Sequence, residues 1–277
     1  PWDPTMGDPF NASDDLDAQE ITVTDFALAQ TQTTTSQYAV FAAAMDFMVA
    51  SQNVSFSDVA FKLANLTDPL KDVTVGTYMG FTSTAGDVLF KESGMTNYGL
   101  QRVGTDFIYY STKANDPRAG VSWYGALAYS LWLGGSLPTE GQWELAARSN
   151  GTETPDTYLY AGSDVLNDIA WYSGAGSIKE VATKAKNGIN LYDMSGNVWE
   201  WCADKFDATG NKYPDYTGSD VSSYQSLIDP INNVKGSNRV RRGGSWNSGN
   251  GILSLASRHN NAPAYVDYYN GFRPVLK

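Results

Sequence analysis

The chain has 277 residues, of which 42% are hydrophobic and 13% aromatic, enough for one large globular domain or two small ones. Thirty acidic residues against 19 basic ones give a net charge of −11, and this sign disfavours nucleic-acid binding. The chain has one histidine, His259, and one cysteine, Cys202, which excludes internal disulfides, Cys/His zinc clusters and two-thiol chemistry. We expect Cys202 to be a buried core residue.

The N-terminal end is acidic. Residues 1–61 hold nine acidic residues and no Lys or Arg, and residues 1–20 are rich in Pro and small residues, which predicts a solvated tail or tether over 1–20. No internal repeat divides residues 21–277, so a single α+β domain is the economical interpretation. The first residue is Pro, and no leader pattern follows it. We therefore expect that an export signal has been removed.

Helix signals lie in the first half of the chain. Each joins a Ser or Thr N-cap to apolar residues spaced three and four apart, and two of them include the Gln that completes a capping box. The predicted helices follow Thr34, Ser122 and Thr139, and cover residues 36–48, residues 123 to the glycine pair 134–135, and residues 140–148. Alternating apolar residues between Ile21 and Leu28 predict a strand, and the punctuated apolar runs beyond Asn150 predict loops and short strands.

Residues 191–201 contain a possible cation site. They join two oxygen donors, Asp193 and Glu200, to a glycine-containing turn that can aim backbone carbonyls inward, which is what calcium requires. The alternative is that Glu200 forms an ion pair and that Trp199 and Trp201 belong to the core. The residues alone leave both interpretations open.

Three arginines form a basic cluster near the C-terminal end. Strand alternation directs Arg239 and Arg241 to one face and Arg242 to the other, where they serve structural ion pairs or ligand contacts. Residues 239–277 contain six bases and one acid, a net charge of +5. This locally basic end favours an acidic partner.

Residues 247–270 have an unusual composition. Asn, Ser, Gly and Tyr supply 13 of the 24 residues, as in antibody contact loops, where tyrosine gives rigid contact area and the small residues adapt. The same 24 residues contain no Lys, Glu, Gln, Met or Trp. This composition predicts a binding surface, and the alternative is a Gly- and Asn-rich loop without a ligand.

Several motifs in one order resemble the formylglycine-generating-enzyme (sulfatase-modifying factor) domain. They are Val121-Ser122-Trp123 with 126–129, Leu137-Pro138-Thr139-Glu140 with 143–148, the run from Gly188 to Trp201, Arg242-Gly243-Gly244-Ser245-Trp246, Arg258, and Gly271-Phe272-Arg273. The resemblance extends from Ile21 to the C-terminus. It implies a variant C-type-lectin fold of the α+β class, with much irregular structure.

This chain lacks the two cysteines that the enzymes of this family use. They use two cysteines shortly after the motif matched by residues 243–246, and the matching positions here are Ser248 and Leu253. Neither residue binds copper or forms a redox pair, so we expect no copper and no enzymatic activity. An enzyme of the same fold with different chemistry, using His259 and the region of Arg239 and Arg241, is one alternative, and a purely structural interaction module is another.

A second branch with this fold, the variable proteins of diversity-generating retroelements, is more similar. In that branch the segment after Arg-Gly-Gly-Ser-Trp is rewritten by adenine-directed mutagenesis of asparagine codons, which would explain the missing residue types. This resemblance implies a non-enzymatic protein that binds varied targets from a bacterial surface. We expect a ligand-binding site formed by Asn247, Ser248, Asn250, Gly251, Ile252, Leu255, Ser257, His259, Asn260, Asn261, Ala264, Tyr265, Tyr268 and Tyr269.

The resemblance also implies a cofactor, partners and a location. A structural calcium ion would be held by the side chains of Asp193 and Glu200 and by the carbonyls of Gly196 and Val198. We expect the ligand to be a protein or a glycan and not a nucleic acid. The positive charge of residues 239–277 favours an acidic ligand. We expect an exported monomer, an outer-membrane lipoprotein whose lipid anchor lies outside this chain.

Overall fold

The computed structural model describes residues 23–52, 113–149, 151, 157–206, 231 and 236–276, with the backbone of four short strands between 77 and 109. Side chains of the first helix are described as far as residue 44. The predicted tail, residues 1–20, and the start of the predicted strand at Ile21 lie outside the described residues. None of the described helices is both long and apolar enough to cross a membrane.

The first described elements are β1 (Ala27–Leu28) and α1 (Thr35–Gln52). The strand is shorter than the alternating pattern predicts, because its antiparallel partner, β10 (Val275–Leu276), offers only two residues. The capping box before α1 is present: the Thr34 N–H donates to Gln37 Oε1 at 2.8 Å, and the Gln37 N–H donates to Thr34 Oγ1 at 3.3 Å. The predicted helix is confirmed, and it extends four residues further than predicted.

Helices α3 (Trp123–Trp132) and α4 (Glu140–Arg148) begin and end at the predicted signals. The Ser122 hydroxyl caps α3 by accepting the Gly125 N–H at 3.1 Å. At Gly135 a Cβ would lie 2.2 Å from the Val275 carbonyl oxygen, so glycine is required where the chain after α3 passes β10. The capping box of Thr139 and Gln142 is complete.

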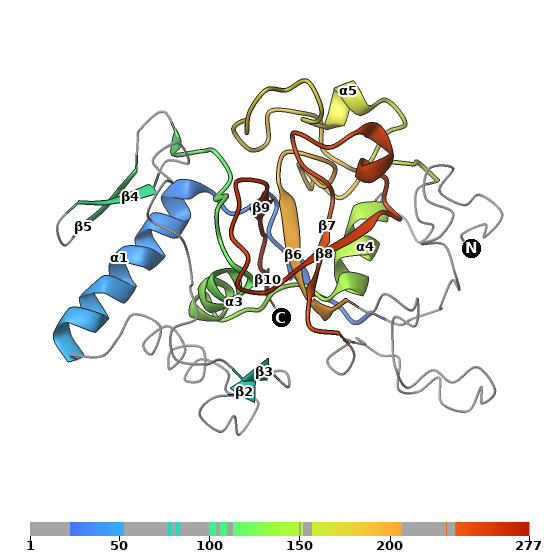
Figure 1. Cartoon of the computed structure of the whole chain (residues 1–277). Coiled ribbons are helices and arrows are strands. Elements are labelled where there is room, and N and C mark those ends of the chain that lie inside the picture. Colours follow the sequence, from blue (N-terminus) through green and yellow to red (C-terminus); the bar gives the residue numbers. More distant parts are fainter. Residues whose placement is uncertain are drawn as a thin grey trace, which may run out of the picture.

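A four-stranded sheet lies at the centre. Its order is β8 (Arg258–Asn261), β7 (Arg239–Arg242), β6 (Trp199–Lys205) and β9 (Asn270–Gly271); β6 and β9 run parallel, and the other pairs are antiparallel. The sheet stands between α3 and α4 (Figure 1). Strand alternation directs Trp201 into the cluster that includes α3 and Cys202 into the cluster that includes α4. Cys202 is fully buried, as expected, and burial raises the pKa of its thiol.

The remaining described elements are short. Two hairpins, β2 (Thr77–Tyr78) with β3 (Phe81–Thr82) and β4 (Leu100–Val103) with β5 (Asp106–Tyr109), precede α3, and β5 lies against α1. Helix α5 (Leu166–Ile169) and the 3-10 helix η4 (Asn250–Leu253) each have four residues. The prediction of loops and short strands beyond residue 150 is confirmed for the described residues.

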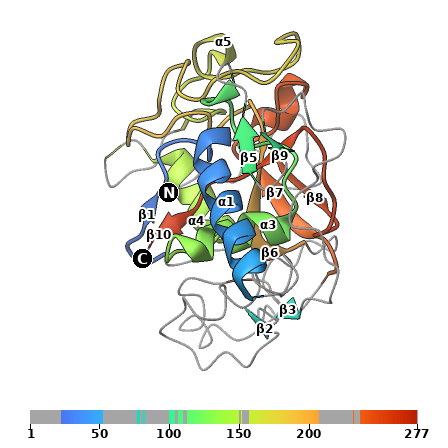
Figure 2. The same ribbon diagram turned by 90° about the vertical axis from the view of Figure 1, so that its left-hand side faces the viewer.

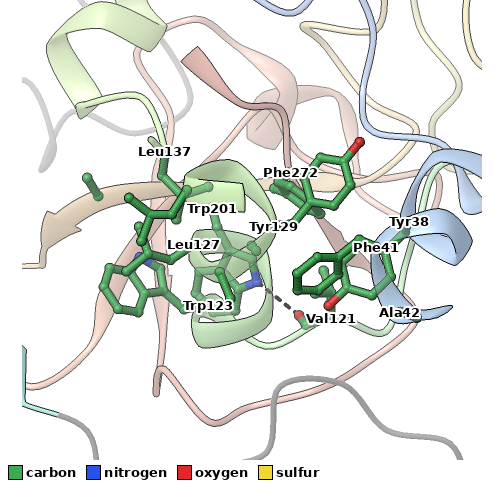
Figure 3. Close-up of a cluster of buried hydrophobic side chains, with 14 of the residues drawn as sticks. Tyr38, Phe41, Ala42, Val121, Trp123, Leu127, Tyr129, Leu137, Trp201 and Phe272 are labelled. Carbon is green, nitrogen blue, oxygen red and sulfur yellow. Dashed lines mark hydrogen bonds between the residues drawn. The ribbon is translucent and has the colours of Figure 1, made fainter. Parts of the chain in front are cut away.

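The larger hydrophobic cluster joins both ends of the domain (Figure 3). Tyr38 of α1 stacks on Tyr129 of α3 at 5.5 Å between ring centroids, and Phe272, next to β9, meets Tyr129 edge-on at 5.3 Å. Trp201 Nε1 donates to the Val121 carbonyl at 3.1 Å. Because Phe272 directly follows β9, this cluster fixes the C-terminal end of residues 247–270.

Candidate ligand-binding face

Two arginines of β7, Arg241 and Arg242, form hydrogen bonds with residues 247–270. Arg242 is fully buried, donates to the carbonyls of Leu255, Ala256 and Ser257 at 2.5–3.1 Å, and pairs with Glu144 at 2.6 Å. A buried guanidinium with this many acceptors orders the backbone that it contacts. The predicted alternation is confirmed, because the guanidinium of Arg242 lies over Trp143 on the α4 side.

Arg239 and Arg241 point to the other side of the sheet. Their guanidinium carbons lie 3.8 Å from the ring centroid of Trp123 and 4.9 Å from that of Trp199. Burial lowers the pKa of Arg239 to about 10 and also lowers that of Arg241. The Arg239 guanidinium is therefore part of the core, whereas that of Arg241 borders the segment.

Most of the predicted ligand residues are accessible to solvent. Seven are exposed: Asn247, Asn250, Ile252, His259, Ala264, Tyr265 and Tyr268. Four are half-buried: Gly251, Asn260, Asn261 and Tyr269. The segment runs from η4 through β8 to β9, the two edge strands of the sheet, and can be followed by its red colour in Figure 1 and Figure 2. Eleven of the fourteen predicted ligand residues are therefore accessible to solvent.

Three predicted ligand residues are buried, and their assignment is corrected. Leu255 is 1% exposed and packs in the cluster of Trp143 and Val240. The Ser248 hydroxyl accepts the Ser245 N–H at 3.0 Å, and Ser257 is 5% exposed above Arg242. The backbone between η4 and β8 turns inward to meet Arg242, and this turn follows no period that the sequence displays. All three residues support the face from within.

An aromatic patch, defined as Trp246, Tyr268 and Tyr269, forms one part of the face. The Trp246 ring lies 6.0 Å from Tyr268 and 5.4 Å from Tyr269, and the two tyrosine rings are 4.1 Å apart. The Tyr269 hydroxyl donates to that of Tyr268 at 2.8 Å and accepts from Asn247 Nδ2 at 3.4 Å. The hydrogen bond to Tyr268 raises the pKa of Tyr269 to about 12, so the Tyr269 hydroxyl remains a neutral donor at physiological pH.

A polar cluster around Arg241 continues the face. Arg241 contacts His259 Nδ1 at 3.2 Å and also bonds to the side chain of Asn270. Burial raises the pKa of Asp267, whose carboxylate accepts the Tyr269 and Asn270 backbone N–H groups at 2.9 and 3.0 Å. Through Asp267 the polar cluster and the aromatic patch form a continuous surface.

Tyr265 is the most exposed tyrosine of this surface, with 44% of its area accessible. The nearby Asp267 carboxylate raises its pKa. Residues Asn250 to Ile252 lie apart on η4, which is anchored by Leu253 in the cluster of α5. Asn260 accepts a hydrogen bond from Asn238 Nδ2 at 2.6 Å near the end of β8. The structure therefore joins Asn247, His259 and the three tyrosines, and places the η4 residues separately.

The basic character predicted for this end does not reach the surface. Arg239, Arg241, Arg242 and Arg273 are buried, and Arg258 forms a bidentate pair with Glu140 at 2.5 and 2.6 Å. These cations are neutralised by carboxylates of α4 and β6 or stack on tryptophan rings. The preference for an acidic ligand stays a prediction, and these arginines do not supply its charge.

A hollow of about 240 Å³ adjoins Trp246 and Tyr268. Its other walls come from residues outside the predicted segment: Lys113, Asp116, Pro117, Gly176, Ser177 and Ile178. The sequence does not indicate that these residues lie next to residues 247–270, because no spacing or motif connects the two sets. Residues from other parts of the chain therefore form a hollow next to the aromatic patch.

The residues at the positions of the enzymes' cysteines are both buried. Leu253 is fully buried, and Ser248 bonds to Ser245. His259 Nδ1 is engaged by Arg241 and accepts the Asn260 N–H at 2.8 Å. The hollow lies beside Trp246 and Tyr268, so it does not place an acid and His259 together in a pocket.

Four residues predicted to bind calcium meet at a nitrogen atom of this chain, although Asp193 does so with its backbone carbonyl and not with the predicted side chain. The carbonyls of Asp193, Gly196 and Val198 and the carboxylate of Glu200 surround the side-chain amide of Gln32. The Asp193 carboxylate is turned away and accepts the Ala182 N–H at 2.8 Å, and burial raises its pKa to about 6. Within the described residues, no three Asp, Glu, His or Cys side chains group as a metal site.

Comparison with known proteins identifies relatives of two kinds. The chain is 35% identical over 174 residues to serine/threonine-protein kinase pkn1 of Chlamydia caviae, covering 63% of this chain and 26% of the kinase. It is 33% identical over 179 residues to the formylglycine-generating enzyme of Thermomonospora curvata, covering 58% and 55%. It is 31% identical over 176 residues to inactive C-alpha-formylglycine-generating enzyme 2 of Bos taurus, covering 58% and 50%. The chain thus spans about a quarter of the kinase and about half of the other two.

Among solved structures, Treponema denticola variable protein 1 has a similar fold. The TM-score is 0.53 at 18% identity, and the match covers 92% of this chain and 86% of the variable protein. The model of the sulfatase-modifying factor enzyme 1-like domain matches residues 4–277. The family contains both enzymes and inactive members. The chain therefore belongs to the sulfatase-modifying factor enzyme 1-like domain family and has its C-type-lectin-like, mixed α/β fold.

Proposed function

We propose that this chain is a non-enzymatic binding protein that presents residues 247–270 on a bacterial surface and that a diversity-generating retroelement rewrites this segment. The observation that carries the proposal is the exposed aromatic and polar surface running from Asn247 through the tyrosines to His259, held by a buried scaffold. The fold shared with Treponema denticola variable protein 1 supports it. The target is a protein or a glycan, and the chain acts as a monomer, with its lipid anchor outside this chain.

The physical chemistry of the face suits recognition. Tyr265 and Tyr268 are 44% and 36% exposed and offer large amphipathic rings with few rotatable bonds. The backbone beneath them is held by contacts with Arg242, Arg241 and Asp267 of the same chain. A preorganised surface loses less conformational entropy on binding than a loose loop does.

The absence of family chemistry supports a role in binding. The chain contains one cysteine, Cys202, buried between α4 and the sheet, and the positions of the enzymes' two cysteines hold Ser248 and Leu253. The second hypothesis, an enzyme based on His259, is less favoured, because the hollow found among the described residues is lined by Trp246 and Tyr268 and not by His259. The hypothesis of a structural module is also less favoured, since exposed large apolar side chains are scattered over α1, α4 and the loops.

Two libraries displayed on yeast test the proposal. The first randomises Asn247, His259, Ala264, Tyr265 and Tyr268, and the matched control randomises Leu253, Leu255 and Ser257. Each exposed substitution should change the free energy of unfolding by less than about 0.5 kcal/mol, whereas Leu255→Ala should cost about 2–5 kcal/mol. Protease resistance of the displayed chains measures both.

The face library should remain largely folded and yield binders against panels of purified proteins and glycans. The control library should be mostly unfolded. Equal loss of folding in the two libraries would show that the face is a structural part of the domain. A folded face library without binders to any panel member would contradict its role in recognition.

A further inference from the structure

The side chain of Gln32, between β1 and α1, is fully buried at the turn before β6. Its Nε2 atom lies 2.9 Å from the Val198 carbonyl oxygen, 3.0 Å from Glu200 Oε1, 3.2 Å from the Asp193 carbonyl and 3.3 Å from the Gly196 carbonyl. The four residues are those that the family resemblance assigns to calcium. Here their oxygens converge on an amide nitrogen of the same chain.

The orientation of the amide is fixed by its surroundings. With Nε2 inward, the two amide protons are shared among four acceptors, as bifurcated hydrogen bonds allow. With the amide flipped, Oε1 of Gln32 would face three carbonyls and a carboxylate, which repel it. Oε1 instead points away and has no hydrogen-bond partner among the described residues, a cost that the four contacts of Nε2 offset.

The donor set does not fit a calcium ion beside this amide. Calcium takes six to eight oxygen ligands at about 2.3–2.6 Å, whereas these oxygens stand 2.9–3.3 Å from a nitrogen that fills the space between them. The Asp193 carboxylate is turned toward Ala182. The Glu200 carboxylate also pairs with Arg273 at 2.7 and 2.8 Å, so a cation added beside the amide would share this carboxylate with a guanidinium.

We propose that the Gln32 amide takes the place of the family's calcium ion and makes the stability of this domain independent of calcium. A neutral donor satisfies the same carbonyls without adding charge beside Arg273. It also ties the segment between β1 and α1 to the turn before β6. In this way one side chain performs the cross-linking role that a bound ion performs elsewhere.

The test compares wild type, Gln32→Ala and Gln142→Ala by thermal unfolding in EDTA and in millimolar CaCl₂ at constant ionic strength. Gln142→Ala is the matched control, because it removes another buried glutamine that hydrogen-bonds to backbone. The midpoint of wild type should not move with calcium. That of Gln32→Ala should fall by about 5 °C or more in EDTA and recover in calcium, whereas that of Gln142→Ala should fall without recovery.

If Gln32→Ala does not fold, the calcium content of purified wild type, measured by atomic emission, tests the proposal. Wild type should contain no stoichiometric calcium after purification in calcium-containing buffer. Stoichiometric calcium, or a wild-type midpoint that falls in EDTA, would overturn the proposal. A Gln32→Ala variant as stable as wild type, or one that calcium does not restore, would also contradict it.

Discussion

Replacing Glu200 by glutamine should lower the free energy of unfolding by about 3–5 kcal/mol. Glu200 is fully buried, and its two oxygens accept hydrogen bonds from Arg273, Trp143 Nε1 and Gln32 Nε2 at 2.7–3.0 Å. Glutamine has nearly the same shape, so the loss comes from charge and donor geometry and not from a cavity. The guanidinium of Arg273, also fully buried, is then left without a counter-charge.

Urea denaturation of wild type, Glu200→Gln and the control Glu180→Gln measures this effect. Glu180 is exposed, so the same chemical change there should alter stability by less than about 0.5 kcal/mol. If the two variants are equally stable, the carboxylate of Glu200 is not the electrostatic centre of the scaffold. The contacts of Glu200 with Gln32 and Arg273 would then contribute little to the stability of the domain.

Replacing Gly196 by alanine should cost about 2–5 kcal/mol, from backbone strain and steric overlap together. Gly196 has φ +90°, a region that residues with a Cβ rarely adopt. The added Cβ would lie 2.3 Å from the Trp171 carbonyl oxygen and 3.1 Å from Leu253 Cδ2. Neither the backbone at Trp171 nor the buried Leu253 can move freely, so the turn before β6 must shift.

Gly176→Ala is the matched control for Gly196→Ala. Gly176 has φ +75°, but a Cβ there would meet no atom within 4 Å, so only the backbone strain of about 1–2 kcal/mol is expected. The difference between the two alanine variants in urea isolates the steric overlap. A Gly196→Ala variant no less stable than Gly176→Ala would mean that the turn is not tightly packed against η4.

Local signals predict the helices of this domain well. The capping boxes at Thr34 and Thr139 and the N-cap at Ser122 involve residues three apart in sequence, so their hydrogen bonds can be inferred from spacing alone. The alternation of Arg239, Arg241 and Arg242 was predictable for the same reason, because a strand places successive residues on opposite faces. The resemblance to a known family then supplied the fold.

The parts that the sequence did not predict depend on contacts between distant residues. Gln32 is 168 positions from Glu200, and no local pattern indicates that its amide fills the turn before β6. The buried Ser248, Leu255 and Ser257 lie in an irregular segment without a period that separates inward from outward residues. Net charge does not record that Arg242 is buried against Glu144, so it does not show how much positive charge faces solvent.

The arrangement divides the C-terminal part of the chain into a fixed layer and an exposed layer. Arg239 and Arg242 of β7, with Arg273, bind backbone carbonyls or carboxylates and thereby fix the course of the chain. The tyrosines, Asn247 and His259 lie above them, where most substitutions leave those contacts intact. A segment built in this way can change its surface without changing its fold.

The proposal that a retroelement diversifies the exposed layer can be tested by sequencing. The DNA to be sequenced, across a population of the source organism, is the part that encodes residues 247–270 and its flanking DNA. We expect substitutions at the eleven accessible ligand residues, including Asn247, Tyr265 and Tyr268, and none at Leu253, Leu255 or Ser257. We also expect a neighbouring reverse-transcriptase gene and a near-copy of the segment that differs at adenines. An invariant segment beside an intact gene, without such a copy, would contradict the proposal.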